Sequence, residues 1–125
     1  MAFRILLVDD EEAVLTATRE YLGGLGYEVD VAGEREEAEA LLATGRYDLV
    51  ISDLHLTGVH GREGLELVGY VRERCPATQM VLLTAYGSAD LEEEVQRHGV
   101  AAVLTKPQPL AHVAELASRL LEARP

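Results

Sequence analysis

Short apolar runs alternate along the chain with stretches in which apolar residues recur every three or four positions. Tyr27–Ala32 alternates apolar and acidic residues, which predicts a half-exposed strand nearer the edge of a sheet. Four other runs are almost wholly aliphatic and predict strands buried on both faces, as central parallel strands are: Phe3–Val8, Leu49–Ser52, Met80–Leu83 and Val100–Leu104.

The intervening stretches have the apolar spacing of amphipathic helices. One begins at the acidic residues Asp9–Glu12 and ends near Gly26, where glycines stop it. The others are Glu34–Thr44, a helix from near Glu63 to Pro76, Ala89–His98 and Leu110–Leu121. Strands that alternate with helices predict an α/β fold with a parallel sheet covered on both faces.

Polar side chains follow the four apolar strands at the points where these strands end. Asp9 and Asp10 follow the first strand, and Asp53 follows Leu49–Ser52. Thr84 and Lys106 come after the last two strands. Because functional groups gather beyond the carboxyl ends of parallel strands, these five side chains predict one site.

The residue types at these strand ends favour phosphoryl chemistry. Three neighbouring carboxylates raise one another's pKa unless a cation lies between them, and Mg²⁺ prefers such oxygen ligands. Asp53 can then act as a nucleophile that forms an acyl phosphate. Thr84 would donate a hydrogen bond to the phosphoryl group, and Lys106, the only lysine among eleven basic residues, would supply a second cation.

Composition limits the other classes of function. The net charge of −11 argues against direct binding to nucleic acid and to an anionic membrane surface. Cys75 is the single cysteine, so no internal disulfide forms, which fits a reducing compartment. The first apolar run is too short for a signal peptide or a membrane span. We therefore expect a cytoplasmic protein.

Four motifs contain these strand-end residues: ILLVDDEE at 5–12, DLVISDLHL at 48–56, VLLTAYGS at 81–88 and LTKP at 104–107. With these motifs, residues 3–122 resemble a response-regulator receiver domain, the phosphoacceptor module of two-component signalling. The resemblance implies a flavodoxin-like doubly wound sheet of five parallel strands with five helices, and one domain over residues 1–125 with no output domain. It implies a regulatory domain, not an enzyme, which catalyses only its own phosphorylation and dephosphorylation.

The same resemblance assigns the metal site. Asp53 receives a phosphoryl group from a histidine kinase or a histidine phosphotransfer protein in a Mg²⁺-dependent reaction. Asp10 and Asp53 bind Mg²⁺ directly, together with the main-chain carbonyl of His55. Asp9 holds the ion through water.

The resemblance also describes a switch. Lys106 pairs with the phosphoryl group, Thr84 moves to hydrogen-bond it, and the bond from Lys106 to Pro107 resembles the usual cis peptide of the family. The family usually has an aromatic residue three positions before its lysine, and this chain has Val103 there. Tyr86 is either a substitute switch residue or a surface tyrosine that shields the site.

The resemblance implies that the output is a protein contact through the fourth helix, the last strand and the fifth helix, in a monomer or weak dimer. The chain is alternatively a receiver piece of a larger hybrid kinase or regulator. Residues 58–64 make the loop after Asp53 about three residues longer than usual. This loop is either a neutral insertion or a contact for a specific partner.

Three rival functions remain open. A flavin-binding module of similar fold would bring a phosphate to the loop after the first strand, where the acidic residues 9–12 would repel it. A phosphatase with an aspartyl nucleophile would need an acid two positions after Asp53, where His55 stands. A receiver-like domain that only binds partners would work without phosphorylation.

Overall fold

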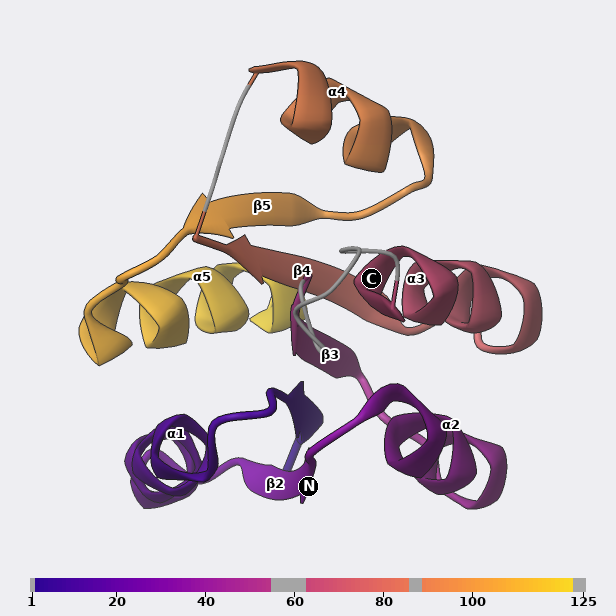
Figure 1. The fold of residues 1–125 in the computed structure, drawn as a ribbon. Helices are drawn as coiled ribbons and strands as arrows, with labels where there is room; N and C mark the ends of the chain where they lie inside the picture. Colours follow the sequence, from indigo (N-terminus) through magenta and orange to yellow (C-terminus); the bar gives the residue numbers. More distant parts are fainter. Residues whose placement is uncertain (1, 55–62, 86–88, 123–125) are drawn as a thin grey trace.

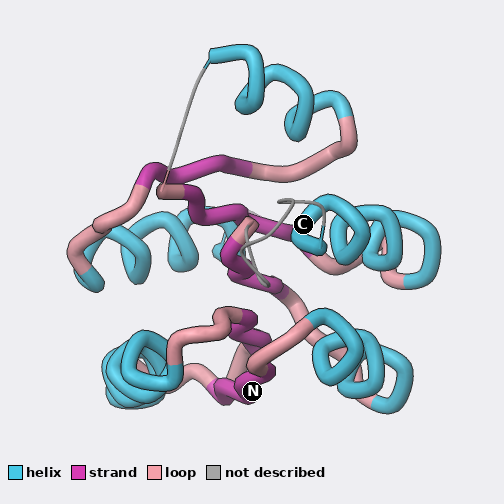
Figure 2. Tube along the Cα trace, viewed as in Figure 1, coloured by secondary structure: helices cyan, strands magenta, loops and turns pink. Residues whose placement is uncertain are grey.

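The computed structural model describes residues 2–54, 63–85 and 89–122, in which strands and helices alternate (Figure 1, Figure 2). The strands are β1 (Arg4–Val8), β2 (Glu28–Ala32), β3 (Leu49–Asp53), β4 (Gln79–Thr84) and β5 (Ala102–Thr105). The helices are α1 (Glu12–Gly24), α2 (Arg35–Thr44), α3 (Glu63–Arg74), α4 (Ala89–Arg97) and α5 (Leu110–Glu122). None of the described helices is both long enough and apolar enough to cross a membrane.

All five strands pair in parallel in the order β2-β1-β3-β4-β5. Val8 lies opposite Ser52, and Asp53 lies opposite Leu83. This register brings the carboxyl ends of β1, β3 and β4 to one edge of the sheet. The predicted five-stranded parallel sheet with five helices is therefore confirmed.

Helices cover both faces of the sheet (Figure 1). α1 and α5 pack on one face, in a core that includes Leu7 and Ile51. α2, α3 and α4 pack on the other face, in a core that includes Leu6 and Val50. Successive strand side chains point to opposite faces, so both kinds of position must be apolar in a strand that is covered on both sides.

Strand boundaries differ from the prediction by one or two residues, and the differences in β3 and β5 have a clear physical reason. β3 includes Asp53, because the pairing with β4 continues through that residue. β5 begins at Ala102, while Val100 is buried in the turn before it. β5 lies at the edge of the sheet, and its residues are half-buried or exposed because only β4 pairs with it.

Candidate functional site

Asp9 lies directly after β1 with both of its carboxylate oxygens engaged. Its Oδ1 accepts a hydrogen bond of 2.9 Å from the main-chain N–H of Glu11, at the beginning of α1. Its Oδ2 accepts a bond of 2.9 Å from Nζ of Lys106. Only 3% of Asp9 is exposed, so two contacts fix the orientation of a buried carboxylate.

Asp53 is the last residue of β3 and is 7% exposed. The main-chain N–H of Leu54 donates to the carbonyl of Leu83 at 2.8 Å, so the hydrogen-bonded ladder with β4 continues beyond Asp53. Oδ2 of Asp53 accepts a bond of 3.2 Å from Nζ of Lys106. The pairing of β3 with β4 therefore fixes the main chain of Asp53, and the ammonium of Lys106 contacts its carboxylate.

Lys106 reaches this site from the turn between β5 and α5. Its main-chain N–H donates to the carbonyl of Thr84 at 2.7 Å, and the side chain of Thr84 is fully buried at the end of β4. The bond from Lys106 to Pro107 is cis, as the resemblance implies. The side-chain amide of Gln108 donates to the carbonyl of Thr105 at 2.8 Å, which closes the turn around Lys106.

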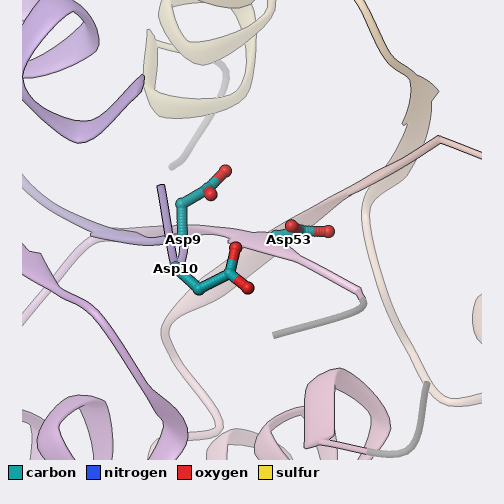
Figure 3. Close-up of side chains that lie close together, drawn as sticks. All are labelled: Asp9, Asp10 and Asp53. Atoms are coloured by element: carbon teal, nitrogen blue, oxygen red, sulfur yellow. The ribbon is translucent and has the colours of Figure 1, made fainter. Parts of the chain in front are cut away.

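Carboxylate oxygens of Asp9, Asp10 and Asp53 all lie within 4.8 Å of one another (Figure 3). Burial, followed by the charges of Asp53 and Asp9, raises the pKa of the Asp10 carboxyl. Burial alone would lower the pKa of Lys106, but its contacts with Asp9 and Asp53 outweigh burial and raise it. Lys106 therefore stays protonated, and the three carboxylates still exceed its single charge.

The donor set at this edge fits a hard divalent ion. All three side chains offer oxygen, the ligand that Mg²⁺ and Ca²⁺ prefer. Asp10 is exposed, so its carboxylate can bind an ion that arrives from solvent. The neighbouring carboxylate of Asp9 is buried and fixed in orientation. A divalent ion here would relieve the mutual repulsion of the carboxylates.

The structure brings Asp9, Asp10, Asp53 and Lys106 together, and the main chain of Thr84 adjoins them. His55, Tyr86 and residues 58–62 lie outside the described residues. Val103 is half-buried and packs against the core under α4.

Sequence reasoning did not find the contact from Lys106 to Asp9 or the bond made by Gln108. Lys106 and Asp9 are 97 positions apart, so no local pattern links them. A polar residue just after Pro107 was the available signal for Gln108, but such residues are common in turns.

Comparisons with known proteins agree with this geometry. A family model described as the response regulator receiver domain matches residues 5–118. The chain is 35% identical over 119 residues to response regulator protein FleR of Pseudomonas aeruginosa, a match that covers 95% of this chain and 24% of FleR. The chain thus spans about a quarter of the length of the curated relatives it matches.

Two solved structures have the same fold. A CheY-like response regulator receiver domain from Methanospirillum hungatei is 28% identical, with a TM-score of 0.90 over 98% of this chain and 95% of that one. A response regulator from Burkholderia pseudomallei, solved with a phosphorylated aspartic acid, a calcium ion and citrate, is 25% identical. Its TM-score is 0.83 over 97% of this chain and 67% of that one. The chain belongs to the response regulator receiver domain family.

Proposed function

We propose that the chain is a phosphoacceptor signalling domain that takes a phosphoryl group onto Asp53 in a Mg²⁺-dependent reaction. The observation that carries the proposal is the position of Asp53, a buried carboxylate between two other carboxylates and the ammonium of Lys106. The related Burkholderia protein, solved with a phosphorylated aspartic acid and a calcium ion, supports the same chemistry.

In this reaction the phosphoryl group moves from an oxygen or a nitrogen of the donor to an oxygen of Asp53. A carboxylate oxygen of Asp53 attacks phosphorus, the bond from phosphorus to the donor atom breaks, and the donor keeps the electron pair. Lys106, already 3.2 Å from Asp53, pairs with the phosphoryl oxygens, and the hydroxyl of Thr84 donates to one of them. These residues orient the group and stabilise its charge. They are not consumed.

Bound Mg²⁺ would neutralise charge on the phosphoryl oxygens. Asp10 and Asp53 would hold it directly, with the main-chain carbonyl of His55 as a third ligand. Asp9 would act through water, which fits the engagement of both its oxygens by Glu11 and Lys106. The oxygen-only donor set supports Mg²⁺ over a transition metal.

The phosphodonor would be a histidine kinase or a histidine phosphotransfer protein, and the response a changed surface for a downstream protein. We place that surface on α4, β5 and α5, where β5 is an edge strand and residues 92–94 of α4 are all acidic. In this proposal residues 1–125 act as one cytoplasmic receiver domain, as a monomer or weak dimer. Direct binding to nucleic acid is disfavoured by the charge of −11.

Acetyl phosphate with Mg²⁺ tests the central step, with intact-protein mass as the readout. We expect the wild type to gain one phosphoryl group, Asp53→Asn to gain none, and the matched control Asp90→Asn on α4 to behave as the wild type. Modification of Asp53→Asn to the same extent as the wild type would overturn the assignment.

Beryllofluoride tests the change of surface separately. With Mg²⁺ it should shift backbone amide resonances at the site and on α4 and β5 of the wild type. The same resonance shifts in Asp53→Ala would contradict the proposal. A wild type that binds its target but takes no phosphoryl group would favour a receiver that works without phosphorylation.

A further inference from the structure

A cavity of about 470 Å³ opens between α1 and α5, beside the acidic cluster that Asp9, Asp10 and Asp53 form. Its floor includes Ile51 of β3, and its walls include Ala17 of α1 and Val113 of α5. α1 and α5 lie on the same face of the sheet (Figure 1). The volume falls within the range of sites that hold small molecules, and the lining is mainly apolar, as such sites are.

Three charged side chains line this cavity, those of Asp9, Glu11 and Lys106. Asp9 and Lys106 line it and bind each other at 2.9 Å, so their charges are largely satisfied. Glu11 also lines it and is exposed, and none of the described residues forms an ion pair with its side chain. The cavity therefore combines an apolar interior with a carboxylate that is available to a ligand.

Charge selects the kind of ligand that fits. An anionic head at the rim would meet Asp9 and Glu11, while Lys106, the one cation among the described residues that line the cavity, already contacts two carboxylates. A cationic head would meet Glu11, a carboxylate with which Lys106 does not form an ion pair. The net charge of −11 adds a field that attracts cations and repels a second copy of the chain.

We propose that the cavity between α1 and α5 binds a small organic cation, with an apolar body between the helices and an ammonium or amidinium head beside Glu11. The cavity adjoins the acidic cluster, because Asp9 belongs to both and Lys106, which also lines the cavity, contacts Asp53. An occupant would therefore alter the rate at which Asp53 is phosphorylated. This second part rests on the proposed function, but binding does not.

Binding is tested without any phosphodonor, by amide resonance shifts of the full chain. Three probes share one ring system: 1-naphthylmethylammonium, neutral 1-naphthalenemethanol and 1-naphthylacetate. We expect shifts at α1, α5 and the end of β3, with the ammonium binding roughly tenfold tighter than the carboxylate. Equal affinity for the carboxylate, or shifts elsewhere on the chain, would overturn the proposal.

Two matched pairs of variants test the geometry. Ala17→Phe should fill the cavity and abolish binding, while Ala43→Phe, on an exposed site of α2, should leave it unchanged. Glu11→Gln should remove most of the preference for the ammonium, and Glu12→Gln, which does not line the cavity, should keep it. Undiminished binding by Ala17→Phe would exclude the cavity as the site.

Because Ala17→Phe has to fold to be informative, its circular dichroism is compared with the wild type. Ala13→Phe, an exposed position that also lines the cavity, is the second blocking variant. Cavity amides that respond to a basic polypeptide and to none of the three probes would assign the cavity to a protein partner and overturn the small-molecule proposal.

The link to phosphorylation is measured last, as the initial rate with acetyl phosphate and Mg²⁺. We expect saturating 1-naphthylmethylammonium to change the rate severalfold in the wild type and not in Ala17→Phe. An unchanged rate with bound probe would overturn the link. Absence of phosphorylation in both proteins, with the probe still bound by the wild type, would overturn the proposed function and leave the ligand site standing.

Discussion

At the scale of single residues, the site is a local excess of negative charge. Asp9, Asp10 and Asp53 face one ammonium, and the structure commits that ammonium to Asp9 and Asp53. Asp10 is the carboxylate that this arrangement leaves least compensated among the three, and its pKa is raised. A functional cluster of this kind lowers the stability of the folded protein when no divalent ion is bound.

We predict that Asp10→Asn is more stable than the wild type at pH 7 without divalent ions. The raised pKa means that the folded protein binds the Asp10 proton more tightly than the unfolded chain does, so the ionised form opposes folding. Because Asp10 is exposed, the gain in the free energy of unfolding should stay below about 1 kcal/mol.

Urea titrations at pH values from 7 down toward the unfolded-state pKa of about 3.9 measure this effect, because the folded protein takes up the Asp10 proton before the unfolded chain does and the two proteins should converge. Asp90→Asn, an exposed aspartate of α4, is the control and should show no gain. Mg²⁺ should stabilise the wild type far more than Asp10→Asn. A variant that is less stable than the wild type at pH 7 would contradict the prediction.

We predict that Lys106→Met destabilises the protein without divalent ions and tightens its affinity for Mg²⁺. Removal of the ammonium takes one partner away from each of two buried carboxylates, at a cost of about 1–3 kcal/mol. A divalent ion then takes over the neutralisation, so Kd for Mg²⁺ should fall roughly tenfold. Calorimetric titration measures the affinity, and weaker binding of Mg²⁺ by this variant would be inconsistent with it.

Lys106→Arg is the matched control, since it keeps the charge and changes the geometry. Its stability and its affinity for Mg²⁺ should lie close to those of the wild type. Both Lys106 variants should accept phosphoryl groups slowly, because methionine carries no charge and a guanidinium does not occupy the position of the compact ammonium.

At the scale of elements, a polar network ties the amino ends of β1, β2 and β3 together, at the opposite edge from the site. The hydroxyl of Tyr47 donates to Oδ2 of Asp30 at 2.6 Å, and the guanidinium of Arg4 lies 3.2 Å from the same carboxylate. The guanidinium also lies over the ring of Tyr47, 4.7 Å from its centre. The main-chain N–H of Arg4 donates to Asp48 at 2.8 Å.

We predict that Tyr47→Phe lowers the free energy of unfolding by about 1–2 kcal/mol at pH 8, because it removes a bond from a buried hydroxyl to a carboxylate. Burial, followed by the bond to Asp30, raises the pKa of Tyr47 to about 12. This contribution is therefore complete below the unfolded-state pKa of about 10 and is lost as the pH rises toward 12.

Urea denaturation at pH 8 and at about pH 11 should show the difference between Tyr47→Phe and the wild type shrinking at the higher pH. Tyr21→Phe, on an exposed residue of α1, should match the wild type at both. A difference that grows with pH would contradict the assigned direction of the pKa shift.

Hydrophobic periodicity predicted the elements well, because each central strand is covered on both faces and each helix on one. The network of Tyr47 escaped prediction, since Asp30 and Arg4 lie 17 and 43 positions before it and no periodic pattern connects them. The inclusion of Asp53 in β3 escaped as well. Its strand character comes from pairing with Leu83, and an aspartate alone predicts a turn.

At the scale of the whole molecule, burial is uneven across the sheet. β1 and β3 lie between paired neighbours, and nearly all of their residues are buried. β5 lies at an edge with no fully buried residue, and Val95 is the one buried residue among the α4 side chains that the structure describes. Two of the three elements of the proposed output surface, α4 and β5, are thus weakly anchored, whereas α5 has four buried residues.

We predict that amide hydrogen exchange of α4 and β5 proceeds by local opening, at a lower free energy than exchange of β1 and β3. Few buried apolar groups resist the separation of α4 and β5 from β4, whereas the central strands open only on global unfolding. Exchange followed by nuclear magnetic resonance measures both. Amides of α4 that exchange as slowly as those of β3 would contradict this account.

The site itself was largely predictable, because parallel topology brings strand ends to one edge whatever the details of packing. Asp9, Asp10, Asp53 and Lys106 are brought together as the sequence predicts. The ion-pair partner of each charged group was not predictable. Whether Lys106 contacts Asp9, for example, depends on differences of an ångström or so in side-chain position. The cavity between α1 and α5 depends on the same detail.

The ammonium at the site has one further consequence, for chemical labelling. Since Lys106 is the only lysine, amine-directed reagents have one side-chain target in the chain, and it lies against Asp53. Its raised pKa keeps it protonated and slow to react until those contacts change. The yield of label on Lys106 thus reports the occupancy of this site without any substitution in the chain.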